Sequence, residues 1–279
     1  MKINGREIAD GILAKLKKEV QGLPNGIKLV VVLIGKNPSS LSFIKQKNKA
    51  VLSIGANLEL ITLPQNTSQT FLINKIKQFN NDTKINGIIV QLPLPTQINH
   101  AIIAQVIAPS KDIDGFNKNS LFTPPIALAV LKILQNCFIN LKKELKNHNQ
   151  IFINWLSTQK ILILGRGDTG GKPISDTFTK MGINFTVAHS KTTNIKELLK
   201  SSNIIISCVG KPNIITGDMI GKNAVCIGVG ISNLHSRLTG DFEEPSVSKL
   251  ASFYTPTPGG VGPINVACLM QNLVISAKK

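Results

Sequence analysis

Short apolar runs alternate with amphipathic stretches along the chain, and this alternation constrains the fold more than any other feature. Three runs in the first part have the length and composition of buried strands: KLVVVLIG (28–35), LELITL (58–63) and INGIIVQL (85–92). Apolar side chains recur at helical spacing in the stretches around them: 5–20, 38–52 and 68–79. Strands that alternate with helices predict a parallel sheet with helices on its faces.

A second block with the same alternation begins at residue 160. Its predicted strands and helices are, in chain order, 160–165, 171–181, 184–189, 193–200, 203–209, 223–230 and a terminal helix at 261–277. A helix over 124–142 connects the two blocks, and residues 143–158 fit no element. We therefore expect an α/β protein of two domains (1–122 and 159–260), with 123–158 as a bridge and the C-terminal helix (261–279) packed back onto the first domain.

The chain is strongly basic. Its 279 residues include 32 Lys+Arg and 15 Asp+Glu, which gives a net charge of +17. Such a charge raises the question of an anionic partner, and the plainer interpretation is a solvated surface coated with lysine. Because the aromatic residues are few and scattered, and no nucleic-acid-binding motif is present, we expect no nucleic acid partner.

Other compositional features bear on compartment and metal binding. No run of about 18 apolar residues occurs, and the N-terminus lacks the apolar core of a secretion signal, so we expect no membrane span. The four cysteines lie far apart and show no metal-ligand spacing. These features predict a reduced, cytoplasmic protein without a metal site.

The segment ILILGRGDTGGKP contains the strongest general motif. Gly165, Gly167 and Gly170 form a G-x-G-x-x-G pattern between a predicted strand and a predicted helix. The first glycine permits a tight turn, the second allows a pyrophosphate to approach the backbone, and the third permits close packing of helix and strand. Phosphate would meet the free N–H groups of the helix start. We therefore expect a dinucleotide site in a Rossmann-type domain.

The end of the next predicted strand bears on which dinucleotide binds. An NAD site usually carries an acidic residue about 20 residues after the glycine turn, where it bonds the ribose 2′-hydroxyl. This chain has His189, Ser190, Lys191 and Thr192 there, and Arg166 inside the turn, all of which suit a 2′-phosphate. NADP is therefore favoured. The alternative is that these are ordinary loop residues and that the acid lies elsewhere.

The first block contains a second candidate site. Phe43 and Lys47 lie one helical turn apart, and a lysine beside an aromatic ring near strand ends can lose solvent and have a lowered pKa. Gln91 ends a predicted strand, where open α/β sheets usually bind ligands, and Asp114 lies in the glycine turn KDIDGFN. Taken separately, Lys47 fits a solvated basic helix and Asp114 fits an ordinary turn.

The segment TPTPGGVGPINVA (255–267) is a third candidate. Adjacent glycines between prolines form a rigid loop whose bare backbone can lie against a flat ligand. A simple connection between elements is the alternative.

Six segments occur together in one order: QLPLP (91–95), KDIDGF (111–116), GRGDTGGKP (165–173), HSKT (189–192), VGKPN (209–213) and PGGVGPINVA (258–267). In that order they resemble the bifunctional methylenetetrahydrofolate dehydrogenase/methenyltetrahydrofolate cyclohydrolase family, known as FolD. The resemblance extends from residue 3 to residue 275. It implies an N-terminal α/β catalytic domain that binds folate, a C-terminal NADP-binding Rossmann domain and a cleft between them.

The resemblance also assigns roles to residues of the first site. It implies that Lys47 is the catalytic lysine, that Gln91 tunes it and that Asp114 anchors the pterin, with Phe43 at the position of a family tyrosine. The remaining substrate-binding positions implied by the resemblance are Val90, Leu92, Pro258, Gly259, Gly260, Val261 and Gly262.

For the cofactor, the resemblance implies that Arg166 and Ser190 hold the 2′-phosphate of NADP. The other positions that it implies are Gly165, Gly167, Gly170, His189, Gly230 and Ile231, the last two near the nicotinamide. It further implies a homodimer and tetrahydrofolate substrates, including polyglutamylated ones.

Three departures from the family pattern stand out. Phe43 lacks the tyrosine hydroxyl, Gly167 replaces a serine, and the connection around residues 140–156 is longer than the family's. One expected outcome is therefore full bifunctional activity, in which methylenetetrahydrofolate is oxidised with NADP and the methenyl product is hydrolysed. The alternatives are a family member with one activity weakened, or another two-domain NADP-dependent oxidoreductase. The paired QLPLP and PGGVGP loops argue against the last.

Overall fold

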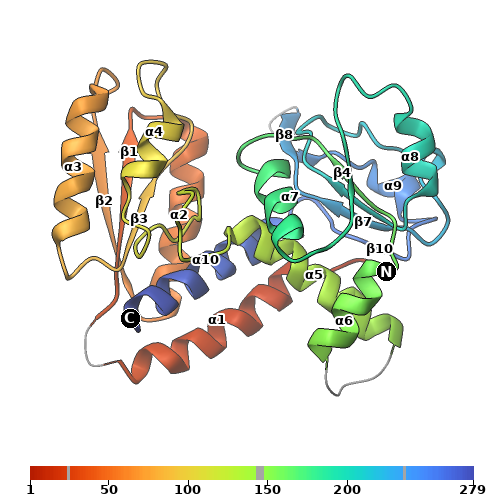
Figure 1. Ribbon diagram of the computed structural model, residues 1–279, viewed down its shortest axis with the longest axis horizontal. Helices are drawn as coiled ribbons and strands as arrows, with labels where there is room; N and C mark the ends of the chain where they lie inside the picture. The colour runs from red at the N-terminus through yellow and green to blue at the C-terminus, as the bar shows by residue number, and fades with distance from the viewer. Residues whose placement is uncertain (24–25, 143–147, 235–236) are drawn as a thin grey trace. The chain divides into compact units, whose positions relative to one another are not determined.

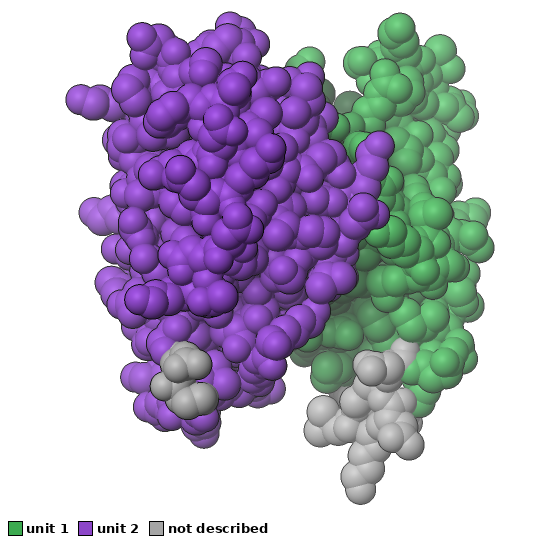
Figure 2. Space-filling model, turned by 60° about the vertical axis from the view of Figure 1, so that its left-hand side comes forward, with its two compact units in different colours: residues 1–8, 126–265 green, residues 9–125, 266–279 purple. Residues whose placement is uncertain are grey.

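The computed structural model describes residues 1–23, 26–142, 148–234 and 237–279, and it divides into two compact units (Figures 1 and 2). Unit 1 comprises residues 1–8 and 126–265, and unit 2 comprises residues 9–125 and 266–279. Each unit is built around a parallel sheet, as the alternating pattern predicted. None of the helices within the described ranges is long and apolar enough to cross a membrane.

Unit 2 contains a three-stranded sheet in the order β2-β1-β3. Its strands are β1 (Lys28–Ile34), β2 (Asn57–Leu63) and β3 (Gly87–Val90). Its helices are α2 (Pro38–Ser53), α3 (Gln69–Asn81), α4 (His100–Val106), most of α1 (Gly5–Gln21) and most of α10 (Val261–Ala277). The sequence analysis predicted all of these except α4.

The central strand β1 explains why helices cover both faces of this sheet. Leu29, Val31 and Leu33 point into a core with α1, α2 and α10. The alternate residues Val30 and Val32 point into a second core with α3 and α4. Successive strand residues face opposite sides, so a strand that is apolar at every position must be covered twice.

Unit 1 contains a five-stranded parallel sheet in the order β10-β7-β6-β4-β5. Its strands are β4 (Ile161–Leu164), β5 (Thr186–Ala188), β6 (Ile204–Ser207), β7 (Val225–Gly228) and β10 (Phe253–Tyr254). Its helices include α5 (Pro125–Lys142), α6 (His148–Ser157), α7 (Gly171–Lys180), α8 (Ile195–Ser201), the short α9 (Glu244–Val247) and the 3₁₀ turn η1 (Gly217–Met219). Because β4 pairs with β5 on one side and β6 on the other, the strand order reverses at β4, where open α/β sheets bind ligands.

Several elements of unit 1 have no strong sequence signal. The hairpin of β8 (Ile231–Leu234) and β9 (Arg237–Gly240) is largely exposed, and β10 has only two residues, so neither shows a buried apolar run. Helix α6 occupies the stretch that fitted no element, and its Phe152 and Trp155 pack against Phe138 of α5. Residues 143–147 of the long connection lie outside the described residues.

The division differs from the expected boundaries at the N-terminus. The sequence pattern predicts residues 1–8 to be part of the first domain, but the structure groups them with unit 1. The backbone N–H of Ile3 donates to the Tyr254 carbonyl beside β10, and that of Gly5 donates to the Gly259 carbonyl. These hydrogen bonds extend the sheet of unit 1 by a strand-like bridge between Lys2 and Tyr254.

The C-terminal helix contributes to both units. Residues 266–279 of α10 group with unit 2, where the Asn272 side-chain amide donates to the carbonyl oxygens of Ile113 and Thr123 at 2.9 Å. Ser276 donates in turn to Asn86 and Ser110. The last helix therefore fixes the loop that contains KDIDGF to the sheet of unit 2.

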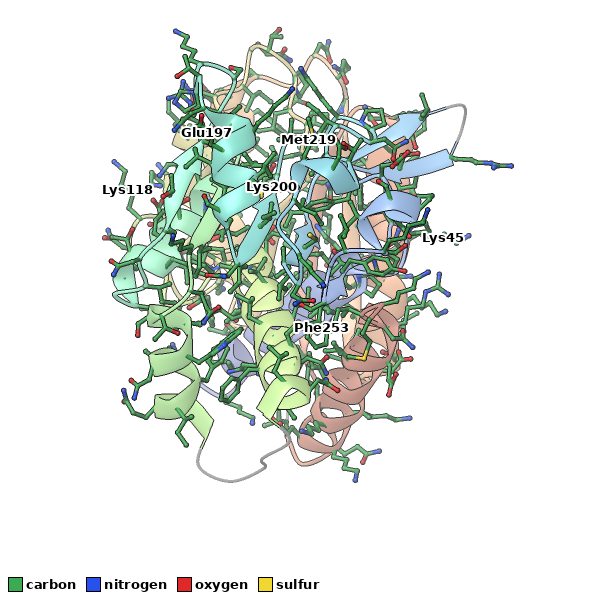
Figure 3. The ribbon with its side chains drawn as sticks, turned by 90° about the vertical axis from the view of Figure 1, so that its right-hand side faces the viewer. Lys45, Lys118, Glu197, Lys200, Met219 and Phe253 are labelled. Atoms are coloured by element: carbon green, nitrogen blue, oxygen red, sulfur yellow. The ribbon has the colours of Figure 1, made fainter. Side chains whose placement is uncertain are left out.

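The lysine excess lies largely at the surface. Lys45, Lys118 and Lys200, which Figure 3 labels, are exposed. One lysine has a structural role: the Lys111 ammonium donates to the carbonyl oxygens of Phe79, Asn80 and Asp82 at the end of α3. These carbonyl groups have no partner within a helix, so Lys111 caps them and holds the start of the KDIDGF loop.

Asp112 gives this loop a pH-dependent stability. Its side chain is buried and accepts a hydrogen bond from the Asn117 backbone at 2.8 Å. Burial raises its pKa to about 6, against 3.8 for an ordinary aspartate. The unfolded chain therefore releases this proton at lower pH than the folded chain does, and stability is lost as the pH rises through 6.

We predict that Asp112→Asn removes this loss, since an amide does not ionise and still offers an oxygen to Asn117. Relative to the parent, the free energy of unfolding of the variant should rise by about 2–3 kcal/mol between pH 4 and pH 7. Urea unfolding at several pH values measures this difference. Asp10→Asn, at an exposed position of α1, is the control, and parallel curves for Asp112→Asn and the parent would contradict the prediction.

Candidate active site

Helix α2 is attached to the loop that follows β3. Asn37 caps the start of α2 by accepting hydrogen bonds from the backbone of Ser39 and Ser40. The Ser40 hydroxyl is buried and donates to the Leu92 carbonyl at 3.1 Å. The sequence analysis missed Ser40, although it lies one helical turn before Phe43. This hydrogen bond holds α2, which carries Lys47, against the QLPLP segment, which begins with Gln91.

The structure brings Lys47 and Gln91 together. The Lys47 ammonium donates to Gln91 Oε1 at 3.0 Å, and the Gln91 amide donates to the Leu92 carbonyl at 2.9 Å. Gln91 follows β3 at the carboxyl edge of the sheet. Its amide N–H₂ is held by the backbone, so its oxygen is directed to the lysine.

Burial lowers the pKa of Lys47, and the negative charge of Asp114 opposes this shift. Burial likewise raises the pKa of Asp114, while the charges of Lys47 and His100 act in the opposite direction. The two groups therefore lie close enough to affect each other's protonation. A lysine with a lowered pKa exchanges protons more readily near neutral pH than an exposed one does.

Three other predicted substrate positions lie in unit 2: Val90 and Leu92 flank Gln91 in the chain, and Phe43 lies one helical turn before Lys47 in α2. Val90 ends β3 and is buried, whereas Leu92 is half-buried. Phe43 is 39% exposed, although it lies in a helix whose Ile44, Ala50 and Val51 pack into the core. His100 contacts Phe116 edge to face, with 5.2 Å between the ring centres.

The PGGVGP loop belongs to unit 1. Gly259 has a φ of +103°, a conformation that favours glycine, and a Cβ on Gly260 would lie 2.6 Å from the Pro256 carbonyl oxygen. Thr257 donates its backbone N–H to Glu244 at 2.7 Å. Pro258, Gly259 and Gly260 therefore form a closely supported turn, and Val261 and Gly262 begin α10. All five residues belong to a different unit from Lys47, Gln91 and Asp114.

The glycine turn lies between β4 and α7, as predicted. Gly165 has a φ of +94°, and a Cβ on it would lie 2.8 Å from the Cys208 carbonyl oxygen. Gly167 has no atom within 4 Å of that position, so its outer side is open to a ligand. Gly170 precedes α7, and the next residue, Gly171, is more constrained because its Cβ would lie 2.0 Å from the Gly165 carbonyl oxygen. The G-x-G-x-x-G pattern does not include Gly171, so the sequence analysis did not identify it.

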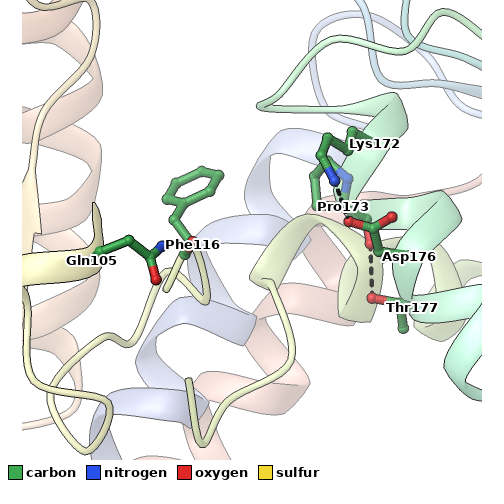
Figure 4. A network of polar contacts seen from close by, with 6 residues as sticks. All are labelled: Gln105, Phe116, Lys172, Pro173, Asp176 and Thr177. Atoms are coloured by element: carbon green, nitrogen blue, oxygen red, sulfur yellow. Dashed lines mark hydrogen bonds and ion pairs between the residues drawn. The ribbon is translucent and has the colours of Figure 1, made fainter. Parts of the chain in front are cut away.

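Helix α7 is stabilised by its own side chains. Lys172 pairs with Asp176 at 2.7 Å, and the Thr177 hydroxyl donates to the Pro173 carbonyl at 2.8 Å (Figure 4). Its first turn contains no acidic residue. The positive end of the helix dipole is thus left for an anionic ligand.

The HSKT segment forms a tight turn after β5. His189 and Thr192 exchange hydrogen bonds, and the Lys191 backbone donates to His189 Nδ1 at 3.2 Å. Ser190, Lys191 and Arg166 are exposed. Since β4 and β5 are parallel neighbours, Arg166 and Ser190 follow strands that end at the same edge of the sheet. No acidic residue lies in this turn, which suits a 2′-phosphate.

Gly230 and Ile231 follow β7 at this edge as well. The Gly230 backbone donates to the Ser207 carbonyl at 2.9 Å, and Ile231 is exposed. The carboxylate of Asp241 lies directly against Gly230, a contact that the sequence analysis did not foresee. Among the described residues, no three His, Cys, Asp or Glu side chains are grouped to hold a metal ion.

Comparisons with known proteins agree with this geometry. Residues 3–114 match the tetrahydrofolate dehydrogenase/cyclohydrolase catalytic domain, and residues 145–279 match the NAD(P)-binding domain of the same family. The chain is 36% identical over 280 aligned residues to a bifunctional protein FolD from Exiguobacterium sibiricum, with 99% of each chain covered. It is 37% identical to a FolD from Bacillus anthracis, with 99% of this chain and 96% of the relative covered.

Solved structures give the same result. A FolD methylenetetrahydrofolate dehydrogenase/cyclohydrolase from Campylobacter jejuni aligns with a TM-score of 0.90 and 32% identity, covering 100% of this chain and 98% of the other. A FolD from Trypanosoma brucei, solved with NADP and an inhibitor, aligns with a TM-score of 0.88 and 28% identity, covering 100% and 97%. The chain belongs to the tetrahydrofolate dehydrogenase/cyclohydrolase family.

Proposed function

We propose that this chain oxidises 5,10-methylenetetrahydrofolate with NADP and hydrolyses the resulting methenyltetrahydrofolate to 10-formyltetrahydrofolate. The observation that carries the proposal is the hydrogen bond from Lys47 to Gln91 beside Asp114, within the segment that matches the family's catalytic domain. Membership of the family supports both activities.

Asp114 is proposed to anchor the pterin. In its ionised form the carboxylate would accept hydrogen bonds from the pterin amino group and ring N–H. Burial raises the pKa of Asp114, and the positive charges of Lys47 and His100 oppose that shift. The exposed ring of Phe43 would pack against the pterin face. Val90 and Leu92, together with the PGGVGP loop, would supply the remaining contacts.

In the hydrolytic step, water would add to the methenyl carbon. The Lys47 amine would accept a proton from this water, which leaves a neutral hydroxyl adduct. The carbon–N5 bond would then break as Lys47 returns that proton to N5, and the hydroxyl would lose its own proton to become the formyl carbonyl. Because its pKa is lowered, a larger fraction of Lys47 is the neutral amine at a given pH, and the hydrogen bond to Gln91 fixes the orientation of the amine. The sum is addition of one water, with release of the proton that balances the positive charge of the methenyl group.

The nucleotide-binding residues fit NADP. Gly165, Gly167 and Gly170 shape the turn, and the open side of Gly167 leaves room for the pyrophosphate. Arg166, His189 and Ser190 would hold the 2′-phosphate, with Gly230 and Ile231 near the nicotinamide. When bound, NADP accepts a hydride from the methylene carbon; the protein's part is to align that carbon and exclude water.

Two further parts of the proposal, the homodimer and the polyglutamylated folates, come from the family resemblance, and the cytoplasmic location comes from the cysteine pattern. We infer that the chain acts as a homodimer in the cytoplasm, on folates that include polyglutamylated forms. Phe43 supports a second candidate, a family member with weakened hydrolysis, because it removes a hydroxyl beside Lys47.

We predict that Lys47→Met lowers methenyltetrahydrofolate hydrolysis at least about 100-fold, because the variant keeps the side-chain length but has no amine to accept a proton. The fall in methenyl absorbance measures the rate. Lys45→Met, an exposed lysine on the same helix, should retain full activity. Hydrolysis by Lys47→Met at the parent rate would exclude the proposed role.

A variant with the hydroxyl restored distinguishes the two candidate functions, full bifunctional activity and weakened hydrolysis. Phe43→Tyr should raise hydrolysis by about two- to tenfold, the effect of one hydrogen bond, and change the dehydrogenase rate less. The matched control is Phe71→Tyr, at an exposed ring of α3. Equal rates for Phe43→Tyr and the parent would mean that the phenylalanine suffices.

Arg166→Ala should raise the KM for NADP about tenfold or more and leave the KM for NAD nearly unchanged, because only NADP carries the 2′-phosphate that the guanidinium binds. Steady-state kinetics with each nucleotide measures the two constants. Arg237→Ala, in β9 of the same unit, is the control. Equal increases for NADP and NAD would contradict a 2′-phosphate contact.

A further inference from the structure

Asp241 is a buried acid with no role in the site described so far. It directly follows β9, and its side chain is completely buried, at 0% exposure. No ion pair within the described ranges includes it. Burial of a carboxylate is costly unless hydrogen bonds replace its water shell, so its partners show what it does.

Three donors from one short segment surround the carboxylate. Oδ2 accepts from the Ser207 hydroxyl at 2.6 Å and from the Val209 backbone N–H at 2.8 Å. Oδ1 accepts from the Lys211 backbone N–H at 2.9 Å. The donors are thus the last residue of β6 and two residues of the loop that follows it. One carboxylate therefore fixes the path of the chain as it leaves β6.

The same carboxylate supports the loop after β7. A Cβ on Gly230 would lie 2.2 Å from Asp241 Oδ2 and 2.4 Å from the Gly210 backbone nitrogen, so only glycine fits there. Strands β6 and β7 are parallel neighbours, with Ser207 opposite Gly228, and their loops leave the same edge of the sheet. Asp241 therefore joins two adjacent loops at the edge where open α/β sheets bind their ligands.

We propose that Asp241 is a positioning residue for the nicotinamide end of the dinucleotide. It holds residues 208–211 and Gly230 in the arrangement that places Ile231 beside the ring. This inference rests on the proposed nucleotide site, which includes Gly230 and Ile231. Asp241 does not itself contact the cofactor, because its carboxylate is enclosed by its own loops.

The chemistry requires a carboxylate rather than an amide. Both oxygens accept hydrogen bonds, one from Ser207 and Val209 and the other from Lys211. An asparagine has one acceptor oxygen, so its N–H₂ would face at least one of these donors. Asp241→Asn should therefore release part of the loop with almost no change in side-chain volume.

Cys208 provides an independent chemical readout. Burial, with a smaller contribution from the nearby charge of Asp241, raises the pKa of its thiol to about 12. Its side chain is half-buried, whereas the other three cysteines are buried. A Cβ on Gly170 would lie 3.3 Å from that of Cys208, so the thiol borders the glycine turn. Loss of the Asp241 charge should lower the thiol pKa and speed alkylation of Cys208.

The experiment compares Asp241→Asn with the parent full-length enzyme. We expect the KM for NADP to rise about tenfold or more, a larger effect than on kcat. Hydrolysis of methenyltetrahydrofolate, which uses no nucleotide, should stay within about twofold of the parent. Iodoacetamide should alkylate Cys208 faster, as mass spectrometry of the peptide would show. The exposed Asp218→Asn, in the same unit, should change none of these.

Two further variants separate the possible failures. Ser207→Ala removes one donor and should raise the KM for NADP about two- to threefold; it decides the question if Asp241→Asn does not fold. An unchanged KM for NADP in a folded variant, or an equal fall of both activities, would overturn the positioning role. If Arg166→Ala also leaves the KM for NADP unchanged, the proposed nucleotide site itself is wrong; if Arg166→Ala raises it, only the role of Asp241 fails.

Discussion

Burial of parallel strands on both faces is the constraint on which the rest of the structure depends. Every residue of β3, β4, β6 and β7 is buried, so polar side chains are confined to the ends of the strands. Gln91, Arg166 and Gly230 follow the carboxyl ends of such strands, and Ser190 follows the edge strand β5, which is partly exposed. In each unit the chemistry is therefore concentrated at one edge of a sheet, which the hydrophobic cores hold rigid.

Within unit 2, that constraint leads to a lysine with altered acidity. Ser40 attaches α2 to the loop after β3, and Gln91 is fixed by the backbone of the same loop. Lys47 is thereby held in a partly desolvated position opposite Asp114. Burial lowers the pKa of the lysine, and the hydrogen bond to Gln91 fixes the orientation of its side chain. Together these two effects support the hydrolytic role proposed for Lys47.

Much of this arrangement could be predicted from the sequence. The apolar runs located most strands of both sheets, and strand ends and turns pointed to Gln91, Asp114 and the glycine turn. Ser40, Gly171 and Asp241 could not be found in this way, because their roles depend on contacts with segments distant in the chain or on exact backbone approach. The hairpin β8–β9 could not be predicted either, because its residues are mostly exposed and show no apolar periodicity.

The central claim is that Lys47 is desolvated and held beside Gln91 and Asp114. Its most direct test is the pKa of its ammonium group, measured by NMR of the protein with isotope-labelled lysine. The Lys47 signal is identified by its loss in a variant that lacks this lysine. The account predicts titration clearly below the ordinary lysine value of 10.5. Titration at or above 10.5 would show a solvated or fully ion-paired lysine and would contradict the account.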